Sequence, residues 1–411
     1  MSAIANLSPT NRRNLQFMFF GALLFWACMA AMLPVMSVYL QGSGANNQQV
    51  GWIMGAFAVG LLAFRSRMGL LADRKGRRGV MLIGITVAAI APLCYPLTNN
   101  LLLLTAIRVF HGLSIAAYTT GYSALVADLA PPESRGEVIG YMSLSNPIGM
   151  AIGPALSGYL QPIVGDAKVF YLCSALALGS LLLSSRIRTG PPPQKPEGFE
   201  EVETVGLWAL VSGDRLRIPT LNMLTVGLAF GILSTFVPLF VREMKIDVNV
   251  GLFYTMAAVS SFGSRFIVGK ASDRYGRGPF LMLGLVCYCA AMVLLWRADT
   301  AFEILFAGLV EGFGGGTFLP LTIALVSDRA YPHERGRMLG LCIGGFDLGI
   351  ALSGAMLGQV ADWLGYRMLF GVAAGFVLVG IVVFLTLSSK DVRSSMRFAM
   401  GRGRDLYALP R

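Results

Sequence analysis

The sequence predicts an all-α integral membrane protein, with about twelve transmembrane helices in two pseudo-symmetric bundles of six helices each. The first observation is composition: 55% of the 411 residues are hydrophobic and 13% are charged, whereas a soluble chain carries about 25% charged residues. The second is a series of apolar runs, most of them as long as the roughly 20 residues needed to cross a bilayer. The third is a charged motif that occurs twice, 200 residues apart.

Apolar runs define the predicted spans. Those of the first half are residues 15–40, 49–72, 79–97, 101–128, 136–162 and 168–186. Those of the second half are residues 219–241, 250–272, 279–297, 301–328, 336–362 and 366–388. They divide the chain into an N-terminal six-helix bundle (1–186), a cytoplasmic linker (187–218), a C-terminal six-helix bundle (219–388) and a basic cytoplasmic tail (389–411).

The predicted linker is the one long polar break in the sequence. It contains three consecutive prolines, Pro191 to Pro193, followed by the acidic residues Glu197, Glu200, Glu201 and Glu203. Such a composition favours an extended segment without a packed core.

The net charge of +11 could indicate nucleic-acid binding, but the placement of the charges excludes that interpretation. Most Lys and Arg residues fall in loops on one side of the predicted spans. The loops of the other side contain Lys168, Arg242, Lys245, Arg297 and Arg367. Cytoplasmic loops are the ones enriched in Lys and Arg. We therefore expect a multi-pass protein of the cell membrane with both termini in the cytoplasm, and a basic tail that contacts anionic lipid headgroups.

Two charged segments repeat in the same register. The loop after the second span, Gly69 to Arg78, reads GLLADRKGRR, and the loop after the eighth span, Gly269 to Arg277, reads GKASDRYGR. Further along, Asp128 in ADLAPPESRG corresponds to Asp328 in SDRAYPHERG. Two matches at one offset indicate a duplicated six-helix unit, and such repeats are the usual architecture of secondary transporters.

These motifs carry a resemblance to a known family. The Gly69–Arg78 loop resembles the signature loop of the major facilitator superfamily, and the weaker second copy lies where that family has its own. The run from Gly149 to Pro154 in the fifth span resembles the glycine-proline motif of its drug:proton antiporters. Arg108 to Gly112 resembles its Arg-x-x-Gln-Gly element, with His111 where glutamine is usual.

The resemblance implies the major facilitator fold, a central cavity lined by helices 1, 4, 7 and 10, and a charge latch of Asp73, Arg77 and Asp128 at the cytoplasmic gate. The residues support such a latch independently: Gly69 lets another helix approach closely, and a carboxylate at a helix end suits a neighbouring helix N-terminus. Charges that only fix topology, and ordinary tight packing around the glycines, are the alternatives. The predicted gating residues are Gly69, Asp73, Arg74, Gly76, Arg77, Asp128, Asp273, Arg274, Arg277, Gly149, Gly153 and Pro154.

Four ionisable residues lie inside predicted spans, where such groups face a cavity or a partner. They are the candidate proton-coupling residues Arg108, His111, Glu311 and Asp347. Glu311 is a natural proton carrier because burial favours the protonated form of a carboxyl group. His111, its counterpart 200 residues earlier, titrates near neutral pH, and Arg108 can pair with an anion. The alternative for each residue, above all for Asp347, is a structural partner within the bundle.

The predicted cavity is otherwise apolar and aromatic, which suits hydrophobic or amphipathic ligands. The candidate substrate-binding residues are Trp26, Met29, Tyr118, Tyr122, Asn222, Phe230 and Phe313. The alternative for each is contact with lipid or with a neighbouring helix.

The sequence contains no catalytic constellation, no metal-spaced cluster and no nucleotide-binding loop, which argues against an enzyme, a metal site or a cofactor. We predict a monomeric secondary transporter that exports a small hydrophobic or amphipathic compound in exchange for protons, by alternating access. Three alternatives stay open: an uptake symporter or uniporter of a small metabolite, a sensor or scaffold with the same fold, and a membrane enzyme.

Overall fold

The structure is a computed structural model that describes residues 8–131, 135–188, 206–331 and 334–409. Within these ranges the regular secondary structure is helical, with no strand. The prolines and acidic residues of the predicted linker, Pro191 to Glu203, lie outside the described residues.

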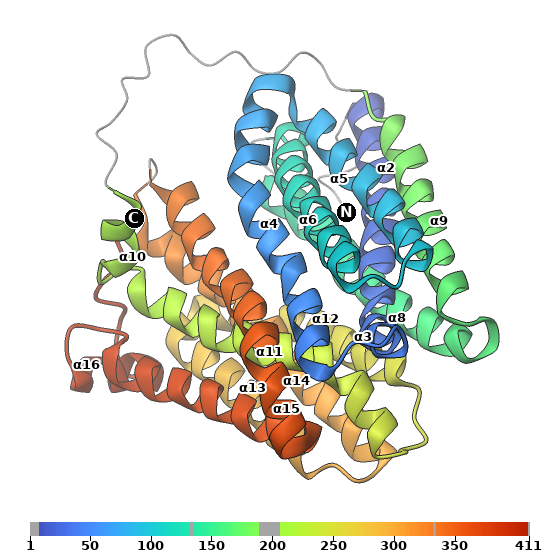
Figure 1. The fold of residues 1–411 in the computed structure, drawn as a ribbon. Coiled ribbons are helices and arrows are strands. Elements are labelled where there is room, and N and C mark those ends of the chain that lie inside the picture. Colours follow the sequence, from blue (N-terminus) through green and yellow to red (C-terminus); the bar gives the residue numbers. More distant parts are fainter. Residues whose placement is uncertain (1–7, 132–134, 189–205, 332–333, 410–411) are drawn as a thin grey trace. The chain divides into compact units, whose positions relative to one another are not determined.

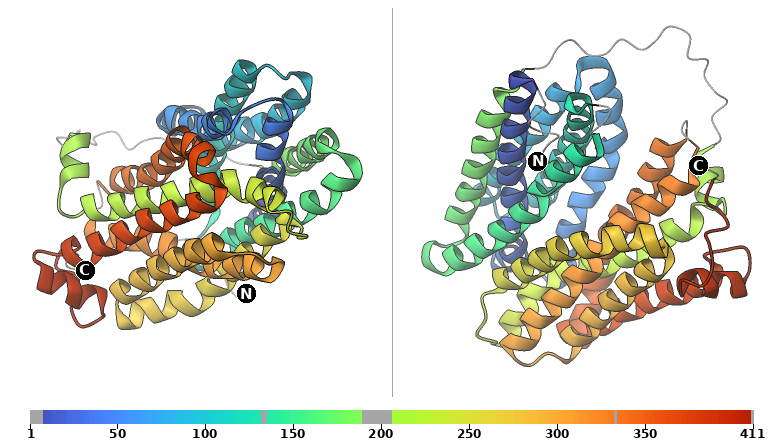
Figure 2. Two further views of the ribbon diagram at one scale, coloured as in Figure 1. Left: turned by 60° about the horizontal axis from the view of Figure 1, so that its bottom comes forward. Right: turned by 180° about the vertical axis from the view of Figure 1, so that it is seen from behind.

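The chain divides into two compact units. The first comprises Met1–Lys195 with Asn249–Thr255, and the second comprises Pro196–Val248 with Met256–Arg411. In the first unit α2, α5 and α9 lie side by side, and α6 packs against α4 and α5 (Figures 1 and 2). The helices that begin in this half are α2 (Pro9–Ala31), α3 (Leu33–Gly42), α4 (Asn47–Lys75), α5 (Arg77–Cys94), α6 (Leu101–Leu129), α7 (Arg135–Ser143), α8 (Ser145–Val164) and α9 (Asp166–Ser185).

In the second unit α11 packs along α15, and α13 packs against both α14 and α15. Two short helices flank this bundle, α10 in the predicted linker and α16 in the predicted tail (Figure 1). The helices of this half are α10 (Leu207–Ser212), α11 (Arg217–Glu243), α12 (Val250–Tyr275), α13 (Arg277–Arg297), α14 (Ala301–Arg329), α15 (Arg335–Leu387) and α16 (Val392–Ala399).

Among the described residues, nine helical stretches are long and apolar enough to cross a membrane. One of them, α15, contains the two predicted spans 336–362 and 366–388, which are separated by the non-helical Gly365. The α7–α8 pair and α12 do not meet the same criterion, but they occupy the places of the predicted fifth and eighth spans. The described chain therefore provides the twelve predicted spans.

The repeat found in the sequence is also present in the backbone. Gly76 and Gly276 interrupt the chain between two helices with φ of 95° and 89°, and Gly165 and Gly365 do so with φ of 82° and 76°. Positive φ is costly for any residue with a side chain. Glycine is therefore required at the same two places in both halves.

Helix crossings repeat in the same register. A methyl group added to Gly112 of α6 would collide with the Phe57 carbonyl of α4, and one added to Gly312 of α14 would collide with the Ala257 carbonyl of α12. Small residues at such crossings let two backbones approach closely. His111 and Glu311 each precede one of these glycines, so equivalent crossings fix their positions within their own units.

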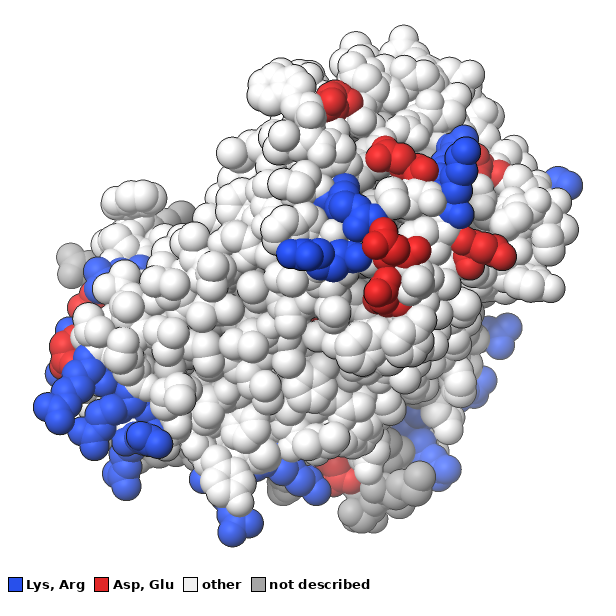
Figure 3. Space-filling view, turned by 90° about the horizontal axis from the view of Figure 1, so that it is seen from below, with Lys and Arg blue, Asp and Glu red and all other residues white. Residues whose placement is uncertain are grey.

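Large apolar side chains cover much of the outer surface, for example Leu97 at 78% exposed and Phe302 at 76% exposed. On the face shown in Figure 3, charged side chains gather in separate groups with wide uncharged surface between them. Such a surface suits hydrocarbon rather than water as its solvent.

Candidate transport site and gates

The buried polar centre of the first unit lies on α6. Arg108 is 8% exposed and His111 is 1% exposed. The Tyr95 hydroxyl lies 3.1 Å from His111 Nδ1, and the Arg108 guanidinium lies 4.8 Å from the centre of the Phe57 ring, a cation–π distance. Tyr95 belongs to the short turn after α5, so it reaches His111 from a neighbouring element.

Two nitrogen atoms of this centre lack partners. Among the described residues, His111 Nε2 and Arg108 Nε are buried and accept or donate no hydrogen bond. Leaving such groups unsatisfied in an apolar interior costs free energy. The centre is therefore suited to a ligand or proton that supplies the missing interaction.

Four of the predicted substrate-binding residues come together beside this centre. The Tyr118 ring stacks on Phe25, with centroids 3.7 Å apart, and on Tyr122, with centroids 5.3 Å apart. The Trp26 ring meets Tyr118 edge to face at 6.3 Å. Met29 lies against α6, with its sulfur 3.5 Å from Ser114 Oγ. An apolar aromatic wall of this kind suits a hydrophobic ligand.

The buried carboxyl group of the second unit is Glu311, which is 7% exposed on α14. Its polar neighbour is Tyr288 of α13. A methyl group placed on Gly315 would lie 3.5 Å from Tyr288 Cε2 and 3.6 Å from Glu311 Oε1, so both groups flank this glycine. The Tyr288 hydroxyl lies near Glu311 but makes no hydrogen bond with the described residues.

Sequence reasoning missed Tyr95 and Tyr288. A tyrosine in an apolar span resembles any other large packing residue, so neither stood out. The repeat contained a usable signal for Tyr288, because the corresponding residue in the first half is Ala88. Tyrosine in one half where the other half has alanine is a difference between the repeats that could have marked Tyr288 as a candidate site residue.

The other candidates of the second unit are more scattered. Asp347 is buried on α15 at 7% exposed. Asn222 lies against Gly380, where an added methyl group would meet its Oδ1 at 2.8 Å, and Phe230 pairs with Phe346 at 5.6 Å. No ring or hydrogen-bond contact between described residues joins Phe313 to these residues.

The first gate loop, Gly69 to Arg78, forms one ion pair with α6. Arg77 pairs with Asp128, and its Nη1 also donates to the Ala124 carbonyl over 3.1 Å. Asp73 is exposed and pairs with no described residue, so within this unit the expected latch consists of Arg77 and Asp128 alone. A methyl group on Gly69 would meet open space, so the close helix approach expected there is absent from the described packing.

In the second gate loop, Gly269 to Arg277, one arginine forms ion pairs with two acidic residues. Arg277 Nε lies 2.5 Å from Asp328 Oδ2, and Arg277 Nη1 lies 3.5 Å from Asp273 Oδ1. Arg274 instead lies over the Tyr275 ring at 5.3 Å. This copy, which is weaker as a sequence motif, has the more connected ion pairs.

The glycine-proline motif packs α8 on α2. A methyl group on Gly149 would lie 2.6 Å from the Leu23 carbonyl, and one on Gly153 would lie 2.9 Å from Ala31 N. Pro154 lies inside α8. Gly349 of α15 contacts the Leu224 carbonyl of α11 in the same way, at 2.5 Å. Close packing of α8 on α2 therefore requires a residue without a side chain at Gly149 and Gly153, and their gating role stays a prediction.

Comparison with known proteins agrees with this architecture. The family model of the Major Facilitator Superfamily matches residues 18–277 and 250–404. An uncharacterised MFS-type transporter of Methanocaldococcus jannaschii is 24% identical, over 86% of this chain and 93% of the relative. The staphylopine export protein of Staphylococcus aureus is 24% identical, over 88% and 92%. The quinolone resistance protein NorA of Staphylococcus aureus is 24% identical, over 90% and 95%.

Solved structures show the same fold. A bacterial homologue of the human lysosomal transporter Spinster, in an inward-facing and occupied conformation, superposes with a TM-score of 0.75 at 15% identity, covering 91% of this chain and 96% of the other. The nucleoside transporter NupG superposes with a TM-score of 0.73 at 15% identity, covering 90% and 98%. The chain belongs to the major facilitator superfamily, and it is a multi-pass membrane transporter of small molecules rather than an enzyme.

Proposed function

We propose that this protein exports small hydrophobic or amphipathic compounds in exchange for protons. The observation that carries the proposal is Glu311, a carboxyl group buried in a membrane-spanning helix beside a single tyrosine. An ionisable residue in such a place is costly and marks a proton or substrate path. The names of two relatives, a staphylopine exporter and a quinolone resistance protein, support the direction of transport.

Each unit supplies a different part of this function. Glu311 takes up and releases the proton, and the wall of Trp26, Met29, Tyr118 and Tyr122 binds the apolar part of the compound. Arg108, together with His111 and Tyr95, forms a polar centre that assists the proton transfer. Asp347 is a secondary candidate for coupling, and Phe230 and Phe313 extend the binding wall. Asn222 is the weakest candidate, because it packs against Gly380.

The gates follow from the ion pairs. Arg77 with Asp128 and Arg277 with Asp328 hold their loops in one state and separate in the other, with Asp73, Arg74, Asp273 and Arg274 as further charged members. Gly76 and Gly276 provide the turns. The protein acts as a monomer in the cell membrane, with both termini in the cytoplasm and with its substrate and the proton bound alternately.

The test uses vesicles that contain the purified protein, an imposed pH gradient and the amphipathic cation ethidium. Wild-type protein should move ethidium against the proton flow, and Glu311→Gln should abolish the pH-driven flux. The matched control is Glu303→Gln, which makes the same change at the exposed first turn of the same helix. Flux of wild-type size in Glu311→Gln would refute the role of Glu311.

The same assay separates export from uptake, because a symporter would move ethidium with the proton gradient. A thermal-shift screen against a panel of compounds then identifies the natural cargo. Binding by the Trp26→Ala variant should be weaker than by wild-type protein, whereas Phe302→Ala, at an exposed position, should leave binding unchanged.

A further inference from the structure

A buried charge outside the transport site lies at the end of α14. Arg329 is the largest fully buried side chain among the described residues, with 1% of its side chain exposed. The corresponding residue of the first half is Leu129. The charge therefore belongs to the second bundle alone, and the topology of the loops does not require a buried arginine.

Its partner comes from the C-terminal tail. Arg329 Nε and Nη2 donate to the two carboxylate oxygens of Asp405 over 2.8 and 2.9 Å. The carbonyls of Arg215 and Ser388 accept further bonds over 3.3 and 3.2 Å. Charge-assisted hydrogen bonds are stronger than neutral ones, and a two-bond pair of this kind also fixes the geometry of both partners. Asp405 is its only carboxylate partner among the described residues.

Aromatic residues of the tail complete the enclosure. The Arg329 guanidinium lies 5.2 Å from the Tyr407 ring and 6.0 Å from the Phe398 ring. Burial raises the pKa of the Tyr407 phenol above its ordinary value. The tail is therefore folded onto the bundle around Arg329.

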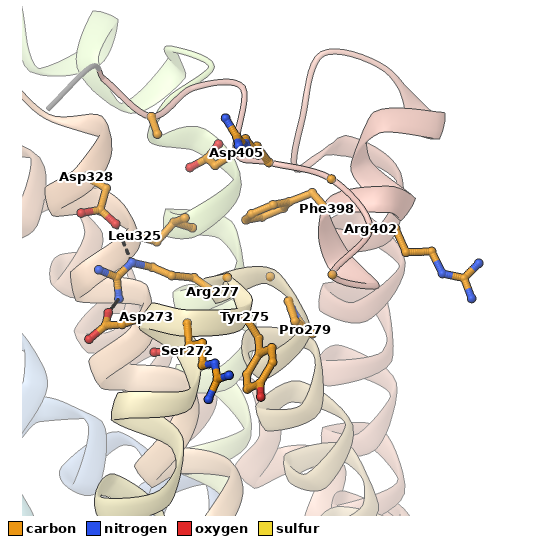
Figure 4. A pocket seen from close by; sticks show the side chains of 17 residues that line it. Ser272, Asp273, Tyr275, Arg277, Pro279, Leu325, Asp328, Phe398, Arg402 and Asp405 are labelled. Atoms are coloured by element: carbon orange, nitrogen blue, oxygen red, sulfur yellow. Dashed lines mark hydrogen bonds and ion pairs between the residues drawn. The ribbon is translucent and has the colours of Figure 1, made fainter.

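The same tail contacts the second gate. Leu409 N donates to the carbonyl of Asp328 over 3.0 Å, and the carboxylate of Asp328 pairs with Arg277. Asp328 directly precedes Arg329 in the chain. The tail therefore bonds to the backbone of Asp328 through Leu409 and to the side chain of the next residue, Arg329, through Asp405. Figure 4 shows Asp405 and Phe398 across a cavity of about 800 Å³ from the ion pairs of Asp273, Arg277 and Asp328.

We infer that Arg329 and Asp405 are positioning residues of the second gate. Through their pair, the tail holds the end of α14 so that Asp328 stays aligned with Arg277. The first gate loop has no equivalent of this pair among the described residues, because Leu129 replaces the arginine. Loss of the pair should therefore loosen one gate loop and leave the other unchanged.

The test measures hydrogen exchange of residues 272–279 and 72–79 together with the melting temperature. In Asp405→Asn, exchange at 272–279 should rise about tenfold, a size typical of coupling between two sites, while exchange at 72–79 stays constant. Asp405→Glu, which retains the charge, should restore protection. Asp299→Asn is the matched control, because it removes the pair with Arg367 elsewhere in the same unit.

A double variant, Arg329→Leu with Asp405→Leu, covers the case in which the single variant fails to fold. Replacing both partners of a buried pair by apolar residues is often neutral for stability. It should keep the wild-type melting temperature and still lose protection at 272–279. Wild-type protection of 272–279 in this double variant, or in a folded Asp405→Asn, would overturn the inference. Because exchange needs no substrate, the result is independent of whether ethidium is transported.

Discussion

Helix α6 of the first bundle and helix α14 of the second begin 200 residues apart and have the same length of 29 residues, yet their buried ionisable groups differ. The first carries Arg108 and His111, linked to Tyr95. The second carries Glu311 beside Tyr288. Equivalent glycine crossings hold both sites. The difference shows that the backbone of the repeat is a common frame, on which each half carries a different set of buried ionisable groups.

The gates differ in a similar way. In the first bundle Arg77 pairs with one acid, Asp128. In the second, Arg277 pairs with Asp273 and Asp328 and the tail supports the loop. Among the described residues, the loop with the stronger sequence motif thus has fewer ion pairs within its own unit. This loop is the better candidate for the gate that moves more freely.

The largest expected effect separates the two buried centres. Glu311→Gln should abolish pH-driven ethidium flux, because the amide cannot exchange a proton. His111→Gln should keep the flux within about twofold of wild type, since an amide can still hydrogen-bond to the Tyr95 hydroxyl. Proton uptake, recorded with a pH-sensitive dye inside the vesicles, should follow the same order. If both variants lost ethidium flux and proton uptake to the same extent, His111 would be as necessary for proton coupling as Glu311.

The second prediction compares the gates. Arg77→Gln should slow ethidium efflux about tenfold, and Arg277→Gln only about threefold, because the tail still holds the second loop. Both pairs are partly exposed, so each loss should change stability by less than about 1 kcal/mol. Adding Asp405→Asn to Arg277→Gln should remove the difference. A larger defect in Arg277→Gln alone would reverse the assignment of the freer gate.

The third prediction concerns the shared frame. Gly165→Ala and Gly365→Ala should each lower the free energy of unfolding by about 1–2 kcal/mol, because both positions have positive φ. Gly140→Ala and Gly340→Ala form a matched control pair, since both are helical and an added methyl group meets open space. Thermal melting of all four variants checks this expectation. If the two substitutions lowered the free energy of unfolding by clearly different amounts, positions 165 and 365 would not be energetically equivalent despite their similar φ angles.

The smallest effect lies in the tail. Asp391 accepts a hydrogen bond from Ser394 N over 2.8 Å at the start of α16, and this bond lowers the pKa of its carboxyl group. A lowered pKa in the folded state means that the carboxylate stabilises α16 above its ordinary pKa and loses this effect as the pH falls. The protection factor of residues 392–399, which is the intrinsic exchange rate at each pH divided by the observed rate, should therefore fall as the pH falls. Asp391→Ala should show the faster exchange already at neutral pH, and the acid effect should vanish in it.

Much of the fold follows from the sequence, because hydrophobic length and periodic charge are local properties. The spans and the loop motifs at Gly76 and Gly276 are examples, and so are the two predicted spans within α15, which the non-helical Gly365 separates. The aromatic wall around Tyr118 was also predictable, because α2 and α6 were expected to line one cavity.

The contacts between distant segments were not predictable. In the sequence, Arg329 is indistinguishable from the other basic residues near the cytoplasmic ends of the spans. Only the folded tail shows that it pairs with Asp405. Tyr95 reaches His111 from a turn, and Tyr288 reaches Glu311 from another helix. Asp73 pairs with no described residue of its own unit, so the contact that the motif implies for it stays a prediction. Such partnerships depend on how helices pack, which a single sequence does not record.

The bond between Arg329 and Asp405 also imposes an order on biosynthesis. The two residues are 76 positions apart, so the ribosome must complete the last predicted span and α16 before the arginine finds its counter-ion. Until then the second bundle holds a cation that its finished form would bury. A nascent chain interrupted in this interval therefore lacks the counter-ion of Arg329 and leaves this arginine unpaired.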